Sequence, residues 1–170
     1  MGPLVRALTY GTLFVGFVLV FVPARVLEWS GVTPPAEWGL AQVAGVVVGL
    51  LGAGLAVWCI LTFPIVGRGT PAPFDPPRRL VVVGPYRWIR NPMYVGAGLA
   101  LAGATLYYKS LALLAYLAVF LFATHLLVLG YEEPTLRRLF GADYEAYSER
   151  VGRWWPRRSR AGAGASSGSA

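Results

Sequence analysis

The stretch from Gly84 to Gly96 brings turn formers, cations and aromatic rings together directly before an apolar run; it reads Gly-Pro-Tyr-Arg-Trp-Ile-Arg-Asn-Pro-Met-Tyr-Val-Gly. Pro85 and Pro92 each disfavour the helical region for the preceding residue, so the chain should bend twice before a helix starts at Met93. Irregular backbone at a membrane edge persists only where protein or a water-filled cavity covers it. We therefore expect a polar pocket wall that binds a ligand. Its side chains would be Tyr86, Arg87, Arg90 and Tyr94.

Two further polar features belong to a later apolar run: the single histidine His125 lies within it, and the pair Glu132-Glu133 follows directly after it. On a regular helix His125 and Glu132 lie about 20° apart and should face the same way, whereas adjacent residues point about 100° apart. At most one of the two glutamates should therefore enter a pocket, and we expect it to be Glu132. An ionisable residue within a span indicates function. A core histidine bonded to a backbone carbonyl and a solvated helix end are the alternative interpretations.

The sequence has no nucleophile-base triad and no HExxH, Walker or GxGxxG element, and Cys59 is its only cysteine. A lone cysteine excludes a disulfide within the chain and a thiolate zinc site. We therefore expect no metal, and interpret Cys59 as a small buried apolar residue.

Apolar side chains make up 56% of the 170 residues and charged ones only 14%, whereas about a quarter of the residues in a soluble domain are charged. The composition predicts an integral membrane protein, which we expect to be all-α. The net charge of +7 indicates attraction to anionic lipid headgroups rather than nucleic-acid binding, because the basic residues flank apolar runs.

About four transmembrane helices are expected, since four apolar runs cross or nearly cross a hydrocarbon core of about 30 Å as helices. Glycines at helical spacing in the second run, at positions 45, 49 and 52, should let another helix approach closely. Lys109-Ser110 should join the last two runs into a hairpin. The long loop 67–92 contains a strand-like patch, 80–83, and should be functional. The four runs are residues 7–24, 38–66, 93–108 and 111–129.

After the fourth run, Pro134 should kink or restart the helix because it cannot donate to the carbonyl of Gly130. Gly141 should end the first of two short amphipathic helices, and Asp143 should cap the second. Such helices lie on the membrane surface or cover a neighbouring cavity. The Gly-, Ala- and Ser-rich tail 159–170 should be disordered, which leaves residues 1–158 as a single domain. The apolar residues at helical spacing are Leu136, Leu139, Phe140, Tyr144, Tyr147 and Val151.

If both ends of the chain lie on one side of the membrane, thirteen of the fifteen Lys and Arg residues fall on that side, and only Arg25 and Lys109 lie opposite. The positive-inside rule then places both termini and the pocket in the cytoplasm.

Two motifs in tandem resemble the isoprenylcysteine carboxyl methyltransferase family and its relatives among membrane phospholipid methyltransferases. The first is the stretch from Gly84 to Gly96, and the second runs Glu132-Glu133-x-x-Leu-x-x-x-Phe-Gly-x-x-Tyr-x-x-Tyr-x-x-x-Val-x-x-x-x-Pro. The resemblance covers about residues 75–158. It implies an S-adenosylmethionine-dependent methyltransferase with the cofactor between the loop before the third span and the end of the fourth. By position, the implied cofactor-binding residues are Arg78, Arg79, Leu80, Val81, Tyr86, Asn91, Pro92, Met93, Tyr94 and Glu132.

Two positions depart from the family pattern. Asn91 stands where the family usually has histidine, and Val128 stands where it has the arginine that binds a substrate carboxylate. A carboxylate acceptor would then need Arg87, Arg90 or Arg153; otherwise the acceptor is another group. In that case His125 is the expected base for an amine, thiol or hydroxyl.

We therefore predict a membrane methyltransferase that acts on a lipophilic acceptor by direct methyl displacement. The catalytic residues would be His125, Arg87 and Arg90, with Val128 and Arg153 beside the acceptor. Two alternatives stay open. One is a nicotinamide-dependent membrane reductase, since sterol reductases share a similar C-terminal helical arrangement. The other is a non-catalytic membrane protein that keeps the fold for lipid binding or assembly.

Overall fold

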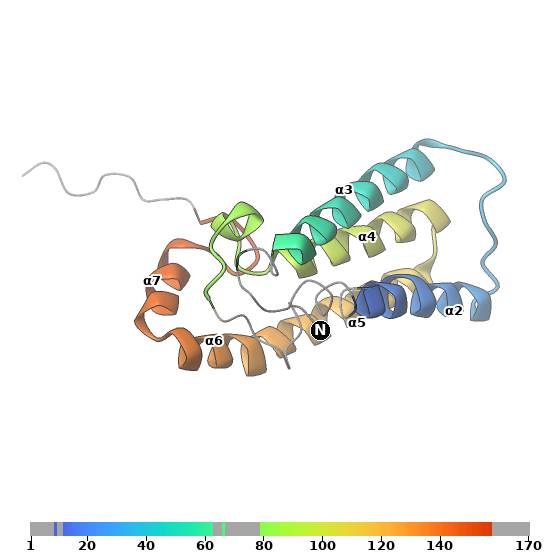
Figure 1. Ribbon diagram of the computed structural model, residues 1–170. Helices are drawn as coiled ribbons and strands as arrows, with labels where there is room; N and C mark the ends of the chain where they lie inside the picture. The colour runs from blue at the N-terminus through green and yellow to red at the C-terminus, as the bar shows by residue number, and fades with distance from the viewer. Residues whose placement is uncertain (1–8, 10–11, 63–65, 67–78, 158–170) are drawn as a thin grey trace, which may run out of the picture.

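The computed structural model describes residues 9, 12–62, 66 and 79–157. Within these residues the fold is all-α, as predicted (Figure 1). The strand-like patch 80–83 forms no strand, and an isolated parallel bridge joins Ile89 to Gly152. The elements in order are the π-helix η1 (Val15–Phe21), α2 (Val22–Trp29), α3 (Leu40–Thr62), the 3-10 turn η3 (Gly84–Arg87), α4 (Pro92–Tyr108), α5 (Leu111–Leu127), the π-helix η4 (Val128–Glu132), α6 (Glu133–Phe140) and α7 (Ala142–Arg150).

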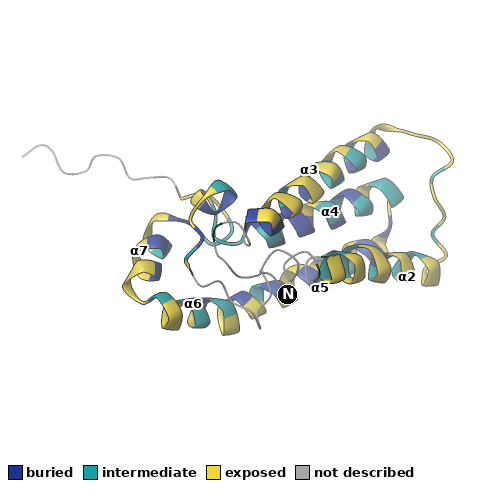
Figure 2. Ribbon diagram, in the orientation of Figure 1, coloured by how far each residue is buried: buried dark blue, intermediate teal, exposed yellow. Residues whose placement is uncertain are grey.

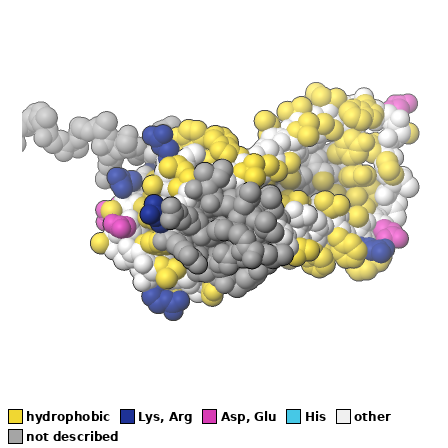
Figure 3. Space-filling model, in the orientation of Figure 1, with side chains coloured by type: hydrophobic (Ala, Val, Ile, Leu, Met, Phe, Trp, Pro, Cys, Tyr) yellow, Lys and Arg dark blue, Asp and Glu magenta, His cyan; other side chains and the backbone are white. Residues whose placement is uncertain are grey.

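Three helical stretches in the described residues are long and apolar enough to cross a membrane: Thr12–Trp29, Leu40–Thr62 and Leu111–Phe140. The expected third span corresponds to α4, whose 17 residues extend about 25 Å, slightly less than a typical hydrocarbon core. Large apolar side chains are exposed along α3 and α5, and in Figure 3 hydrophobic atoms cover the part of the surface away from α6 and α7. Lys and Arg side chains gather toward the opposite end, as expected of a membrane protein with a charged end (Figure 3).

The first span runs through Pro23 to Trp29, so the prediction that it ends at residue 24 is wrong. A π turn makes the continuation possible: the Val22 N–H bonds to the Phe17 carbonyl, five residues back, and this wider turn carries the chain into a proline that offers no N–H. The Tyr116 hydroxyl of α5 donates to the Val18 carbonyl within the turn, at 2.9 Å. The expected start of this span lies outside the described residues.

Helices α3 and α4 pack with their backbones in close approach (Figure 1), which confirms the glycine prediction. A Cβ built on Gly45 would lie 2.6 Å from the Gly103 carbonyl oxygen, and one on Gly96 would lie 2.8 Å from the Gly52 carbonyl oxygen. Both distances are below the 3.0 Å that real Cβ atoms essentially never undercut, so the two helices meet through residues that have no side chain. In Figure 2 the side of α3 turned toward α4 is buried and the opposite side is exposed.

A tight turn joins α4 to α5 in the predicted hairpin. Lys109 adopts the left-handed conformation with φ of 49°, and the buried Ser110 caps α5 by accepting the Leu113 N–H at 3.3 Å.

The helix from α5 to α6 continues through Pro134, so of the two outcomes predicted there, a kink or a restart, the restart is wrong. The π turn η4 lies directly before the proline, and the Glu133 N–H bonds to the Val128 carbonyl, five residues back. As at Pro23, the wide turn accommodates the missing N–H without breaking the helix.

Gly141, with φ of 48°, ends α6 and starts α7. Asp143 lies in the first turn of α7 and makes no capping hydrogen bond, so Gly141 takes the N-cap position that we had assigned to Asp143. Tyr144, Tyr147 and Val151 form one buried cluster, as their spacing predicted, and Leu80, Leu136 and Phe140 pack against it. Leu139 is instead exposed. The tail 159–170 lies outside the described residues.

Candidate functional site

Five segments meet at one end of the molecule: residues 79–91 with η3, the start of α4, the junction of η4 with α6, α7, and residues 151–157 (Figure 1). The bends predicted from the prolines place them there. Gly84 has φ of 57° and Asn91 is non-helical with φ of −123°, so the chain turns before each proline and enters α4 from the side.

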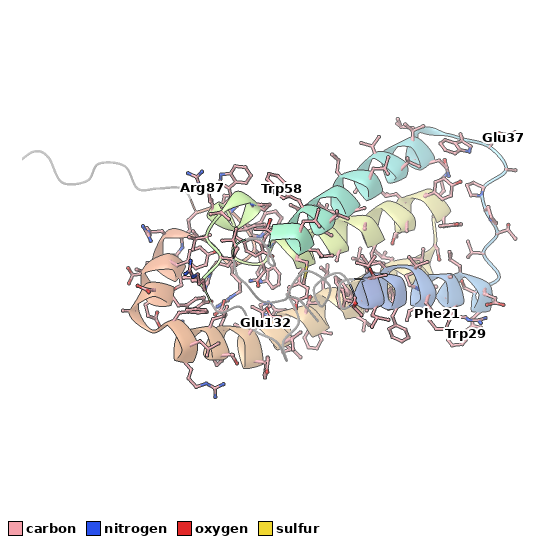
Figure 4. All side chains as sticks on the ribbon, in the orientation of Figure 1. Phe21, Trp29, Glu37, Trp58, Arg87 and Glu132 are labelled. Carbon is pink, nitrogen blue, oxygen red and sulfur yellow. The ribbon has the colours of Figure 1, made fainter. Side chains whose placement is uncertain are left out.

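Glu132 is hydrogen-bonded to Tyr94 across this junction. The Tyr94 hydroxyl, in the first turn of α4, donates to Glu132 Oε1. The Glu132 carboxylate is partly buried on the inner side of the long continuous helix made by α5, η4 and α6 (Figure 4). Among the residues that the structure describes, no Lys, Arg or His nitrogen lies within 4.0 Å of it. A half-buried carboxylate with a hydroxyl donor and no cation suits a positively charged ligand group.

Glu133, in contrast, is fully engaged by two arginines. Arg153 binds it through two parallel hydrogen bonds, Nε to Oε1 at 2.6 Å and Nη2 to Oε2 at 2.9 Å, and Arg90 Nη1 lies 3.2 Å from Oε1. The Glu133 residue is only 6% exposed, so the prediction of a solvated helix end is wrong for it. The hydrogen bond to the Glu133 carboxylate raises the pKa of Arg153 above its ordinary value, and the pair stays ionised. Glu133 therefore fastens the segment after α7 to α6.

Arg90 has one nitrogen left over. Its Nη1 also donates to the Tyr144 hydroxyl at 3.0 Å, but Nε is buried without a hydrogen-bond partner in the described structure. A buried guanidinium nitrogen without an acceptor is costly. An anionic acceptor would satisfy this nitrogen.

A short strap, Gly152 to Trp154, closes over the junction. The Arg90 N–H donates to the Gly152 carbonyl at 2.9 Å and Asn91 Nδ2 to the Arg153 carbonyl at 3.3 Å. Trp154 Nε1 donates to His125 Nδ1 at 3.2 Å. Together with the Arg153–Glu133 ion pair, these hydrogen bonds connect the three consecutive residues of the strap to the turn before α4, to α6 and to α5.

Val128 lies at the centre of the junction and is 0% exposed. It packs in a cluster with Tyr94, Ala97 and other apolar residues, against which Trp154 and Met93 also pack. In this structure the position assigned to the acceptor is therefore a packed core position with no side-chain donor.

The remaining predicted site residues fall into two groups. Val81, Tyr86 and Pro92 are buried, and Leu80 is half-buried; the Tyr86 carbonyl accepts the Tyr147 hydroxyl at 2.7 Å. Arg79 and Arg87 are exposed, and Figure 4 shows Arg87 on the outer side of η3, away from Glu132. The structure thus does not bring Arg87 to the expected catalytic position, because the 3-10 turn directs it outward. Arg78 lies outside the described residues.

Sequence reasoning missed three features of the site: the role of Trp154, the role of Tyr144 and the burial of Glu133. Tyr144 and Glu133 both stood in the second motif, so their positions were visible but their partners were not. Trp154 lies 29 residues from His125, and no spacing rule links a strap residue to a helix residue at that separation.

Residues 40–143 match the family model described as phospholipid methyltransferase. No curated protein and no solved structure matches the chain. The match covers more than half of the chain and includes α3, α4, the continuous helix from α5 to α6 and the first two residues of α7, but not the rest of α7 or the strap. This protein belongs to the phospholipid methyltransferase family of membrane methyltransferases.

Proposed function

We propose that this membrane methyltransferase uses S-adenosylmethionine and that the cofactor binds at the junction of α4 with η4 and α6. One observation carries the proposal: Glu132 is a partly buried carboxylate that has a tyrosine donor and, in the described residues, no cation. The methionine part of the cofactor is a zwitterion. Its ammonium fits Glu132, and its carboxylate fits the partnerless Arg90 Nε.

The chain's own residues would act mainly by positioning. When bound, the cofactor would supply a methyl group on a sulfonium: an acceptor atom would bond to the methyl carbon in line with the breaking sulfur–carbon bond, and the sulfur would leave as a neutral thioether with the bonding electron pair. Such a reaction depends on alignment and closeness, and the Glu132–Tyr94 bond and the ion pairs of Glu133 fix α4, α6 and the strap relative to one another. The apolar cluster around Val128 keeps water from the inner side.

A lipophilic acceptor without a carboxylate is the substrate class we propose. Arg153 is already engaged by Glu133, and the partnerless Nε of Arg90 is assigned above to the cofactor carboxylate. Arg87 faces outward and Val128 offers no donor. A free carboxylate at that depth would cost several kcal/mol. A lipid amine, thiol or hydroxyl would not carry this penalty.

By the distribution of cations, we also propose that both termini and the site face the cytoplasm.

Two measurements test this function. Calorimetry of the detergent-purified protein should show saturable binding of S-adenosylmethionine and of its demethylated product, and none of reduced nicotinamides. Labelled cofactor should then methylate members of a panel of lipid amines, thiols and phenols in preference to a farnesylcysteine analogue. Absence of saturable binding at millimolar ligand by a folded sample would refute the enzyme, and efficient methylation of the farnesylcysteine analogue would refute the acceptor class.

A further inference from the structure

His125 is the only histidine of the chain, and a residue of the strap is hydrogen-bonded to one particular nitrogen of its ring. Trp154 Nε1 lies 3.2 Å from His125 Nδ1, and the rings are tilted by 33° with centroids 6.0 Å apart. An indole N–H can donate but cannot accept. Nδ1 must therefore present a lone pair, and a neutral His125 then carries its proton on Nε2.

The same geometry is incompatible with the other neutral tautomer. A protonated Nδ1 would point an N–H at the indole N–H, and neither could accept from the other. The contact therefore selects one tautomer of neutral His125. Because Trp154 is itself held by the bidentate Arg153–Glu133 pair next to it in sequence, the strap fixes where the indole stands.

We propose that Trp154 is a positioning residue that fixes His125 as the Nε2–H tautomer, so that His125 serves the site as a hydrogen-bond donor and not as its general base. The lone pair that a base would need is occupied by the indole, and Nε2 already holds a proton. The proton that an amine, thiol or hydroxyl acceptor loses on methylation must then leave to another base or to water. This second part rests on the proposed function, whereas the tautomer does not.

The test uses the full protein in detergent with nitrogen-15 labelled histidine and tryptophan. Because the chain has one histidine, its two ring nitrogens give one pair of signals. At a pH where the imidazole is neutral, Nδ1 should appear as a bare acceptor and Nε2 as the N–H. Trp154→Phe keeps a ring but removes the donor, and should move both signals toward the values of a mixture of tautomers. Trp155→Phe is the matched control, because Trp155 is the neighbouring residue and is 80% exposed; it should leave both signals in place.

A reciprocal variant guards against a fold that fails. His125→Ala should shift one indole N–H signal, the same signal that Trp154→Phe removes. A protonated Nδ1 in the unaltered protein, or a Trp154 indole signal unmoved by His125→Ala, would overturn the proposal.

Calorimetry with the demethylated cofactor, run on the same samples, separates this proposal from the proposed function. Lost binding with an intact tautomer pattern would refute only the proposed enzyme activity. If His125→Gln, which keeps an N–H donor, retains at least a tenth of the methyl transfer and His125→Phe does not, the donor role stands; equal loss in both contradicts it.

Discussion

Tyr94 of α4 donates its hydroxyl hydrogen to Glu132 of the π turn η4, and this bond joins the two helices at the point where the five segments of the site meet. The carboxylate of the next residue, Glu133, is bound by Arg153 and Arg90 instead of by a tyrosine hydroxyl. Two adjacent carboxylates thus have different partners, and we propose different tasks for them: Glu132 would meet a ligand cation, whereas Glu133 is closed within the protein.

Glu132→Gln should weaken binding of the demethylated cofactor by about 1.5 to 3 kcal/mol, the usual worth of a hydrogen bond to a charged group. The amide keeps the shape and can still accept from Tyr94 but loses the charge that attracts an ammonium. Calorimetry measures the change. Unaltered affinity would show that Glu132 does not meet the cofactor.

Glu133→Gln should lower stability more than it lowers affinity. The change leaves Arg90 and Arg153 without their buried anion, at a cost of about 2 to 3 kcal/mol, while Glu132 keeps Tyr94. Thermal unfolding in detergent beside the binding measurement separates the two effects. Equal losses of affinity in the two glutamine variants would contradict the division of tasks.

Tyr94→Phe should weaken cofactor binding by about 1 kcal/mol, since the Glu132 carboxylate loses the hydroxyl that orients it. The expected effect is smaller than that of Glu132→Gln because the charge remains. Combining both changes should cost little more than Glu132→Gln alone, as for two members of one contact; full additivity in the binding data would mean that Tyr94 acts elsewhere.

Arg153 and Glu133 should be strongly coupled in a double-mutant cycle. Arg153→Lys cannot reproduce the two parallel hydrogen bonds, and its unfolding penalty should largely vanish when Glu133 is already glutamine. Arg137→Lys is the control, because its ion pair with Glu145 is exposed on both sides and should contribute little. A penalty for Arg153→Lys that persists in the Glu133→Gln background would argue against the pair as the anchor of the strap.

Gly103→Ala should destabilise the protein by about 2 kcal/mol or more, because the added methyl would meet the α3 backbone at Gly45 and Gly49. Gly54→Ala is the matched control on α3, since nothing lies within 4 Å of a Cβ there, and alanine should be neutral or slightly stabilising in a helix. Midpoints of thermal unfolding in detergent give the comparison. Similar midpoints for both variants would disprove the close helix contact.

The sequence predicted those parts of the fold that depend on one residue's own chemistry. Gly45 and Gly52 indicated a close helix contact because only a missing side chain permits one, and Tyr144 and Tyr147 indicated a buried face through their spacing. The possible restart at Pro134 was wrong, because the local rule that a proline breaks a helix ignores the wider turn that can precede it.

The partners in the candidate site were less predictable. Glu133 with Arg153, and His125 with Trp154, are pairs that only tertiary packing brings together. Arg87 was expected in the pocket wall because it lies in the bent stretch from Gly84 to Gly96, whereas its direction depends on the 3-10 turn that contains it. The sequence supplied the types of groups at the site, and the helix registers decided which of them meet.

The π turn η4 also sets the rotational phase between the two halves of the longest helix. It holds one residue more than an α turn would, so everything before Val128 is rotated by roughly 100° relative to everything after Glu132. Deleting Leu129 would return the stretch to α geometry and undo this rotation, and His125 and Glu132 could no longer keep Trp154 and Tyr94 at the same time. The extra residue makes no contact in the site itself. It nevertheless allows one continuous helix to direct His125 toward Trp154 and Glu132 toward Tyr94, which lie in different directions from the helix axis.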